Sequence, residues 1–212
     1  MLRRLVDVLA AILALVLTGP LILVLALAVR LQSTGPAFFG GPRVGKNGRP
    51  FKLWKLRTMI SNAYQEGPNI TSKDDPRITR LGARLREARL DELPQFWNLL
   101  VGDVTLIGPR AEDPEILERY PPEHRWILSV KPGLTGAGTI YYALHQEDTL
   151  PTGESTEEHY LGKLLDEKLT IDRGYLEHQS AWTDLGILLQ TAQYAAGKIF
   201  PSRPSEDDAP RS

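Results

Sequence analysis

The sequence predicts an α+β fold that is mainly helical, with a re-entrant membrane helix at the N-terminus, a small β-hairpin and amphipathic helices at the membrane interface. Three observations predict it: an uncharged apolar run over residues 8–29, an Asn47-Gly48 turn signal between two short strand patterns, and helical apolar spacing further on. The expected parts are a membrane helix over 1–32, a cytosolic-face domain over 33–200 and a disordered tail over 201–212.

The apolar run is long enough for a membrane helix, because about 20 residues cover a hydrocarbon core of roughly 30 Å. Pro20 lies near its middle, where a proline removes a helix hydrogen bond and favours a bend. Basic residues flank both ends of the run, which favours a helix that enters and leaves on the cytoplasmic side. Arg4 and Asp7 have the spacing of an i,i+3 ion pair, which would make Asp7 less costly near the interface.

Two other interpretations of this run stay open. A simple spanning helix is one, because membrane-crossing helices also hold proline kinks. A signal peptide cleaved after Ala28 is the other, although its apolar region would normally be shorter than this one.

The charge is divided unevenly along the chain. The first 90 residues hold 15 Lys and Arg against 5 Asp and Glu, whereas the rest holds 10 against 21. A basic half beside an apolar segment suits an anionic membrane surface and anionic ligands. The chain has no cysteine, which excludes disulfides, thiolate catalysis and Cys-ligated zinc, and its four histidines show no metal-ligand spacing.

Apolar periodicity and turn residues predict the remaining elements. A polar loop over 61–76 separates the hairpin from the helices, and the glycine-rich loop over 131–138 lacks the P-loop Gly-Lys-Ser/Thr. The expected strands cover 37–39, 51–56 and 104–107, and the expected helices cover 77–88, 91–100, 114–120, 122–130, 154–174 and 181–196.

An adjacent carboxylate pair, Asp91 and Glu92, lies in an arginine-rich stretch. Pro94 follows closely, and proline is best tolerated in the first turn of a helix, so we expect Asp91 near a helix N-cap. Free N–H groups there would keep it ionised and would bind phosphate. One carboxylate could then attack phosphorus while the other holds a divalent cation. The alternative is that neither residue is reactive: Asp91 would cap the helix, and Glu92 would only interact with the helix dipole from the first turn.

Two cations end the second predicted strand. Lys55 and Arg57 stand just before Thr58, and they are either a basic edge of the strand or cations aimed at phosphate. The pattern alone does not choose between these interpretations.

With these residues in view, the chain resembles the bacterial sugar-transferase family, the monotopic phosphoglycosyl transferases that start glycoconjugate assembly on undecaprenyl phosphate. The resemblance extends from about Arg4 to Thr191. Its most specific part runs from Asp74-Asp-Pro-Arg-Ile-Thr through Asp91-Glu-Leu-Pro-Gln to Gly108-Pro-Arg110.

The resemblance implies a mechanism and its residues. Asp91 would attack the sugar-linked phosphate of a UDP-sugar, UMP would leave, and undecaprenyl phosphate would take the phosphosugar from Asp91. Glu92 would help to bind Mg²⁺, and Pro20 would break the membrane helix. The cations implied to contact substrate phosphate are Lys55, Arg57, Arg86 and Arg110.

The same resemblance implies the partners: a UDP-sugar, undecaprenyl phosphate and the bacterial cytoplasmic membrane, with the catalytic domain on the cytoplasmic face. Nucleic acid is not expected, and homo-oligomerisation stays open. The chain departs from the family pattern at Ala111, where many relatives have a second proline, and over 137–142, which puts sugar recognition in question. A non-catalytic membrane-surface module that binds anionic lipids is the alternative function.

Overall fold

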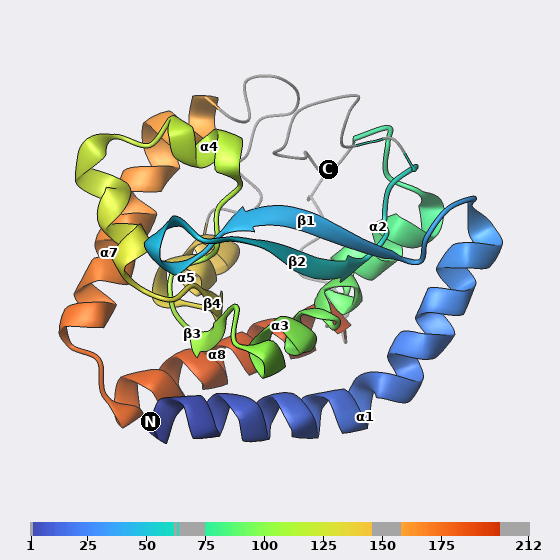
Figure 1. Ribbon diagram of the computed structural model, residues 1–212, viewed down its shortest axis with the longest axis horizontal. Coiled ribbons are helices and arrows are strands. Elements are labelled where there is room, and N and C mark those ends of the chain that lie inside the picture. The colour runs from blue at the N-terminus through green and yellow to red at the C-terminus, as the bar shows by residue number, and fades with distance from the viewer. Residues whose placement is uncertain (1, 62, 64–74, 146–157, 200–212) are drawn as a thin grey trace, which may run out of the picture.

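The computed structural model describes residues 2–61, 63, 75–145 and 158–199. Helices enclose two small two-stranded sheets, which confirms the predicted α+β, mainly helical class (Figure 1). The helices are α1 (Leu2–Gln32), α2 (Arg80–Glu87), α3 (Gln95–Val101), α4 (Pro114–Glu118), α5 (Ala137–His145), α7 (Leu165–Glu177) and α8 (Ala181–Ile199). The strands are β1 (Phe38–Val44), β2 (Pro50–Leu56), β3 (Thr105–Ile107) and β4 (Gly133–Thr135).

Strands β1 and β2 form the predicted hairpin. They pair antiparallel from Phe38 opposite Leu56 to Val44 opposite Pro50. The turn between them (η1, Lys46–Gly48) holds Asn47 at φ 60°, a left-handed conformation that asparagine tolerates. Strand β1 is longer than predicted, because cross-strand pairing carries it through a stretch whose own strand propensity is low.

The second sheet was only half predicted. Strand β3 lies where expected, but the segment predicted as a glycine-rich loop contains β4, which pairs with β3 in parallel. A Cβ at Gly133 would lie 2.2 Å from the nitrogen of Gly108, so this close approach of two backbones requires glycine. The helix α5, which was not predicted, begins directly after β4.

Several helix boundaries differ from the predictions. Helix α2 begins later than expected because Thr79 caps it, its Oγ1 accepting a hydrogen bond of 3.0 Å from the Gly82 nitrogen. The predicted helix over 122–130 is a 3₁₀ segment (η3, Pro122–Ser129), and a π-helical turn (η5, Tyr160–Leu164) precedes α7. The predicted tail over 201–212 and most of the loop over 61–76 lie outside the described residues.

Helix α1 contains the predicted apolar run, and by length and composition it could cross a membrane. It is one helix with Pro20 inside it, and it bends about midway, so that one arm runs under α3 and α8 and the other rises to the start of β1 (Figure 1). The predicted re-entrant topology remains a prediction. Helix α8 likewise exposes apolar side chains, with Trp182 82% and Leu189 55% accessible, as expected for an amphipathic helix at an interface.

The predicted Arg4–Asp7 ion pair is wrong, because each side chain binds the rest of the fold instead. The Arg4 guanidinium donates to the carbonyls of Leu99 and Leu100, at 2.7 and 2.6 Å, and so stabilises the C-terminal end of α3. The buried Asp7 carboxylate accepts hydrogen bonds from the Thr105 hydroxyl at 2.8 Å and from the backbone N–H of Leu106 at 3.0 Å. Long-range partners at these short distances outweigh a local surface pair.

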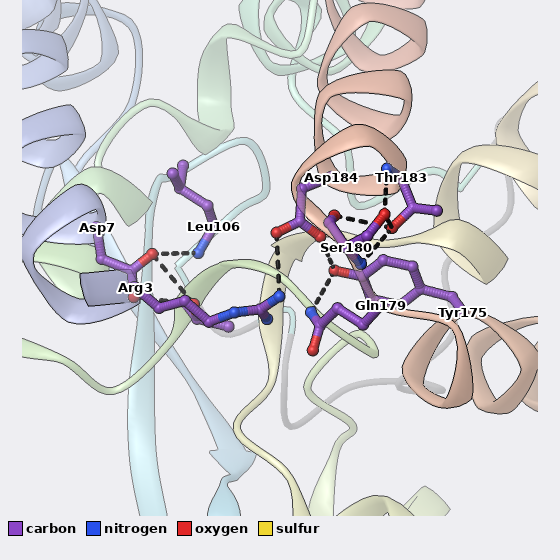
Figure 2. A network of polar contacts seen from close by, with 9 residues as sticks. Arg3, Asp7, Leu106, Tyr175, Gln179, Ser180, Thr183 and Asp184 are labelled. Carbon is purple, nitrogen blue, oxygen red and sulfur yellow. Dashed lines mark hydrogen bonds and ion pairs between the residues drawn. The ribbon is translucent and has the colours of Figure 1, made fainter. Parts of the chain in front are cut away.

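A second contact joins the first turn of α1 to α8 (Figure 2). Arg3 donates to Asp184 at 3.1 Å, and Asp184 also accepts from the Tyr175 hydroxyl at 2.6 Å. Gln179 donates to the same hydroxyl. The N-terminal arm of α1 is therefore attached to α3, β3 and α8, which together carry or flank the candidate site.

Candidate active site

Asp91 lies in a 3₁₀ turn (η2, Leu90–Glu92), close to α3 as expected but three residues before its N-cap, Pro94. The cap position of α3 is Pro94, which has no N–H to continue the hydrogen bonding of the turn, so the helix starts again after it. Arg89, immediately before the turn, has a left-handed backbone with φ 56°. The Asp91 side chain is buried, and no hydrogen bond to its carboxylate is formed among the described residues.

Glu92 is surrounded by cations. Its Oε1 lies 3.2 Å from Lys55 Nζ, 3.4 Å from Arg110 Nη2 and 3.8 Å from Arg89 Nη1. Burial alone would raise the pKa of Glu92, but these three positive charges outweigh it and hold the pKa well below its usual range. Glu92 is therefore ionised at any physiological pH.

The pKa of Asp91 shifts in the opposite direction to that of Glu92. Burial and the adjacent Glu92 charge raise its pKa to about 6, although Lys55, Arg86 and Arg89 act to lower it. Asp91 is still mostly ionised at neutral pH, as expected, but neighbouring side chains and burial set its charge rather than the N-terminus of a helix. Two adjacent carboxylates whose pKa values are driven apart suit two different chemical roles.

Three of the four predicted cations border these carboxylates: besides Arg110, Lys55 and Arg86 reach them from separate elements. Lys55 comes from β2, and burial lowers its pKa more than Glu92 raises it. Arg86 comes from α2, and its Nε donates to Thr58 Oγ1 at 2.8 Å. Helix α2 packs so closely here that a Cβ at Gly82 would lie 2.0 Å from the Thr58 carbonyl oxygen. The hairpin and α2 thus place two cations beside the η2 turn.

Arg57 makes structural contacts that the sequence did not predict. Its guanidinium donates to the carbonyls of Ser33 and Thr34 and to the Ser61 hydroxyl, so it ties the end of α1 to the end of β2. Carbonyls at a helix C-terminus lack intrahelical partners, which makes them good acceptors for arginine. This geometry gives Arg57 a structural contact with the end of α1, and because Arg57 also lines the neighbouring cavity, its assignment to substrate phosphate stays a prediction.

A cavity of about 180 Å³ opens beside the η2 turn. Apolar side chains of the hairpin and the segment after it form part of its wall, and Asp113, which lines it, is paired with Arg43 at 3.0 Å. Asp91 and Glu92 are not among the lining residues, but Lys55 and Arg86 border both the cavity and the carboxylates. Its cationic lining comprises Arg43, Lys55, Arg57, Arg77 and Arg86.

Sequence reasoning missed the contribution of Arg89 and Arg43. Arg89 lies three residues before Glu92, and that spacing alone could have suggested their contact. Arg43 reaches the cavity only because β1 folds beside β2, and no local pattern signals this.

The two adjacent carboxylates could share in holding a divalent cation. The described residues contain no group of three or more His, Cys, Asp or Glu side chains that could form a complete protein cage. Asp91 and Glu92 supply adjacent carboxylates, and the contacts of Glu92 with cations all fall on Oε1. Mg²⁺ is commonly bound by one or two carboxylates together with substrate phosphates and water, and this pair can provide the carboxylates.

Comparison with known proteins gives the chain's relatives. A UDP-glucose:undecaprenyl-phosphate glucose-1-phosphate transferase of Caulobacter vibrioides is 40% identical over 195 residues, which cover 89% of this chain and 67% of the relative. A UDP-N-acetylgalactosamine-undecaprenyl-phosphate N-acetylgalactosaminephosphotransferase of Aeromonas hydrophila is 35% identical, covering 89% and 42%. An undecaprenyl-phosphate galactose phosphotransferase of Salmonella typhimurium is 31% identical, covering 91% and 40%.

The chain thus spans from about two fifths to two thirds of the length of these relatives. Their names carry different sugars, whereas all of them name undecaprenyl phosphate. The sequence profile described as bacterial sugar transferase matches residues 1–198, which includes α1 and the whole site. The chain belongs to the bacterial sugar transferase family.

Proposed function

We propose that this chain transfers a sugar-1-phosphate from a UDP-sugar to undecaprenyl phosphate through a covalent phosphosugar on Asp91, with release of UMP. The observation that carries the proposal is the buried Asp91, with its raised pKa, next to a Glu92 held by three cations. The names of the relatives support the two substrates. The donor sugar stays open, since those names differ in it.

In the first step an oxygen of the Asp91 carboxylate attacks the sugar-linked phosphorus of the donor. The bond from this phosphorus to the bridging oxygen breaks, and UMP leaves with that oxygen. The pKa of about 6 leaves most of Asp91 ionised at neutral pH, while burial keeps the carboxylate poorly solvated and therefore reactive. Ionised Glu92 stays paired with cations and does not compete as nucleophile.

The cations around the pair stabilise charge on the transferring phosphoryl group. Lys55, Arg86 and Arg110 come from β2, α2 and the turn after β3, so they can approach a phosphate from different sides. Preorganised charges of this kind contribute most where water is excluded. A bound Mg²⁺ would be held by Glu92, with Asp91 beside it, and would supply further neutralisation of phosphate oxygens.

In the second step a phosphate oxygen of undecaprenyl phosphate attacks the phosphorus on Asp91. The acyl-phosphate bond breaks, the carboxylate is regenerated, and the lipid carries a diphosphosugar. The attachment of α1 through Arg4, Asp7 and Arg57 supports this step, because it holds the site close to the membrane surface where the lipid phosphate lies. We place the site on the cytoplasmic face of the cytoplasmic membrane, where UDP-sugars are available.

Intact-protein mass measurement tests the proposal. Protein in nanodiscs is mixed with Mg²⁺ and each common UDP-sugar, without lipid acceptor. We expect a mass increase of one phosphosugar per chain, which Asp91→Asn abolishes and added undecaprenyl phosphate removes. If no donor gives an adduct and Asp91→Asn binds anionic vesicles as the wild type does, the non-catalytic lipid-binding alternative replaces this proposal.

A further inference from the structure

Arg89 adopts a backbone conformation that arginine rarely takes. Among the described residues, Asn47 and Arg89 are the non-glycine residues with positive φ. Asn47 lies in a hairpin turn, where its short polar side chain favours such a conformation. Arg89 directly follows Ala88, the C-cap of α2, at a position where a left-handed residue commonly ends a helix but is usually glycine or asparagine rather than arginine. Strained conformations persist only where surrounding contacts hold them, and they cluster at functional sites. The contacts of Arg89 therefore identify what holds the turn that carries Asp91.

Arg89 is held between the active site and the last helix. Its Nη1 lies 3.8 Å from Glu92 Oε1. Its Nη2 donates to the Tyr194 hydroxyl at 3.3 Å, and its guanidinium carbon lies 5.7 Å from the centroid of the Tyr194 ring. The ring also has Lys198 Nζ at 5.4 Å from its centroid. Tyr194 thus offers Arg89 both a hydroxyl acceptor and a π face.

We propose that Tyr194 is a positioning residue for the nucleophile. By holding the Arg89 guanidinium beside Glu92, it keeps the η2 turn in the conformation that presents Asp91 to the donor. Tyr194 lies on α8, 105 residues away in sequence, and acts through Arg89 rather than on the substrate. This inference rests on the proposed function, since it concerns the first chemical step of that reaction.

A purely structural role for Tyr194 makes a different prediction. If the ring only stabilises α8, its loss lowers the fraction of folded chains, and the remaining chains react at the normal rate. If Tyr194 positions Arg89, every chain still reacts, but each reacts more slowly. The rate of adduct formation at saturating donor and the final occupancy of Asp91 separate the two roles.

The experiment measures adduct formation for Tyr194→Leu, Tyr194→Phe and the control Gln193→Ala, whose side chain is exposed on the same helix. We expect Tyr194→Leu to slow the saturated rate about tenfold, a size typical of coupled neighbours, with unchanged half-saturating donor concentration and full final occupancy. Tyr194→Phe keeps the π face and should be slowed less. Gln193→Ala should match the wild type.

Two further measurements complete the test. In an Arg89→Gln background, Tyr194→Leu should have no additional effect, because the residue through which it acts is gone. Amide hydrogen exchange over residues 89–93 should be faster in Tyr194→Leu than in Gln193→Ala, and this readout needs no donor, so it tests the contact even if the proposed reaction fails. A wild-type rate and wild-type exchange in Tyr194→Leu would overturn the inference, as would equal effects of Tyr194→Leu with and without Arg89.

Discussion

Glu92 and Glu112 are both partly buried near a lysine, yet the two clusters around them are built differently. Glu92 belongs to the active-site cluster, in which its contacts with Lys55, Arg89 and Arg110 are ionic. Glu112 belongs to what we call the tyrosine cluster, formed by Glu112, Tyr120, Tyr160 and Lys168. There, Oε2 of Glu112 accepts hydroxyl hydrogen bonds of 2.7 and 2.8 Å from the two tyrosines, and Lys168 donates to Tyr160 at 2.9 Å.

The two lysines show the consequence. Burial acts to lower the pKa of both, but in Lys168 the neighbouring Tyr160 and Glu112 outweigh it and the pKa is raised. In Lys55 burial prevails and the pKa is lowered, because Arg110 and Arg43 oppose the attraction of Glu92. A hydrogen-bonded network that satisfies its members stabilises a fold, whereas crowded charge with a shifted carboxyl beside it is typical of a reactive site.

The largest expected effect comes from Glu92→Gln. This substitution removes the carboxylate that balances three cations, and with it the main proposed contact to the metal ion. We expect adduct formation to slow by about 10³-fold, as for loss of a preorganised charge. The matched control is Glu87→Gln on the exposed side of α2, which should react at the wild-type rate. Equal rates for the two variants would remove Glu92 from the active-site cluster.

A substitution in the tyrosine cluster should lower the free energy of unfolding rather than the rate of adduct formation. Glu112→Gln removes the charged acceptor of both tyrosine hydroxyls and one of the negative charges that act on Lys168, the other being Asp172. Loss of hydrogen bonds to a charged group costs about 3 kcal/mol. Denaturant unfolding measures this loss, with the exposed Glu118→Gln as control. The adduct rate per folded chain should stay the same. A slowed rate without lost stability would show that the tyrosine cluster takes part in the chemistry.

The pH dependence of adduct formation distinguishes the clusters further. Because the raised pKa of Asp91 is about 6, the carboxylate is protonated below that pH, and the rate should fall about tenfold per unit there. Above pH 6 the rate should reach a plateau. The negative charge of Glu92 contributes to raising this pKa. In Glu92→Gln, the pH below which the residual rate falls should therefore be lower than in the wild type. An acid limb near pH 4 in the wild type would contradict this account.

The smallest effect is expected from Tyr160→Phe. It removes one hydroxyl that bridges Glu112 and Lys168, for a loss of about 1–2 kcal/mol in unfolding free energy, with Tyr120 still bonded to Glu112. Thermal unfolding would show a lowered midpoint. No loss of stability would mean that the cluster is not the saturated network described above.

Local patterns predicted much of this chain. The apolar run predicted α1, Asn47-Gly48 predicted the hairpin, and the Asp91-Glu92 pair predicted the centre of the site. Each of these rests on neighbours in sequence: continuous hydrophobicity, turn chemistry or adjacent charges.

What the sequence could not predict depends on distant partners. Arg4 and Asp7 suit each other by spacing, but α3 and β3 offer them better partners. The contacts of Arg57 with Ser33 and Thr34 could not be predicted, because nothing local reveals that the end of α1 lies beside it. The raised pKa of Asp91 could not be predicted for the same reason, since burial is its largest cause and burial is a property of the whole fold.

The identity of the carboxylate that carries the phosphosugar tests the central claim most directly. Hydroxylamine converts an acyl phosphate to a hydroxamate, which marks its position for peptide mass spectrometry. After reaction with a UDP-sugar and Mg²⁺, we predict a hydroxamate on Asp91 and an unmodified Glu92. A hydroxamate on Glu92 would exchange the roles of the two carboxylates. Transfer to undecaprenyl phosphate without any hydroxamate would contradict a covalent mechanism.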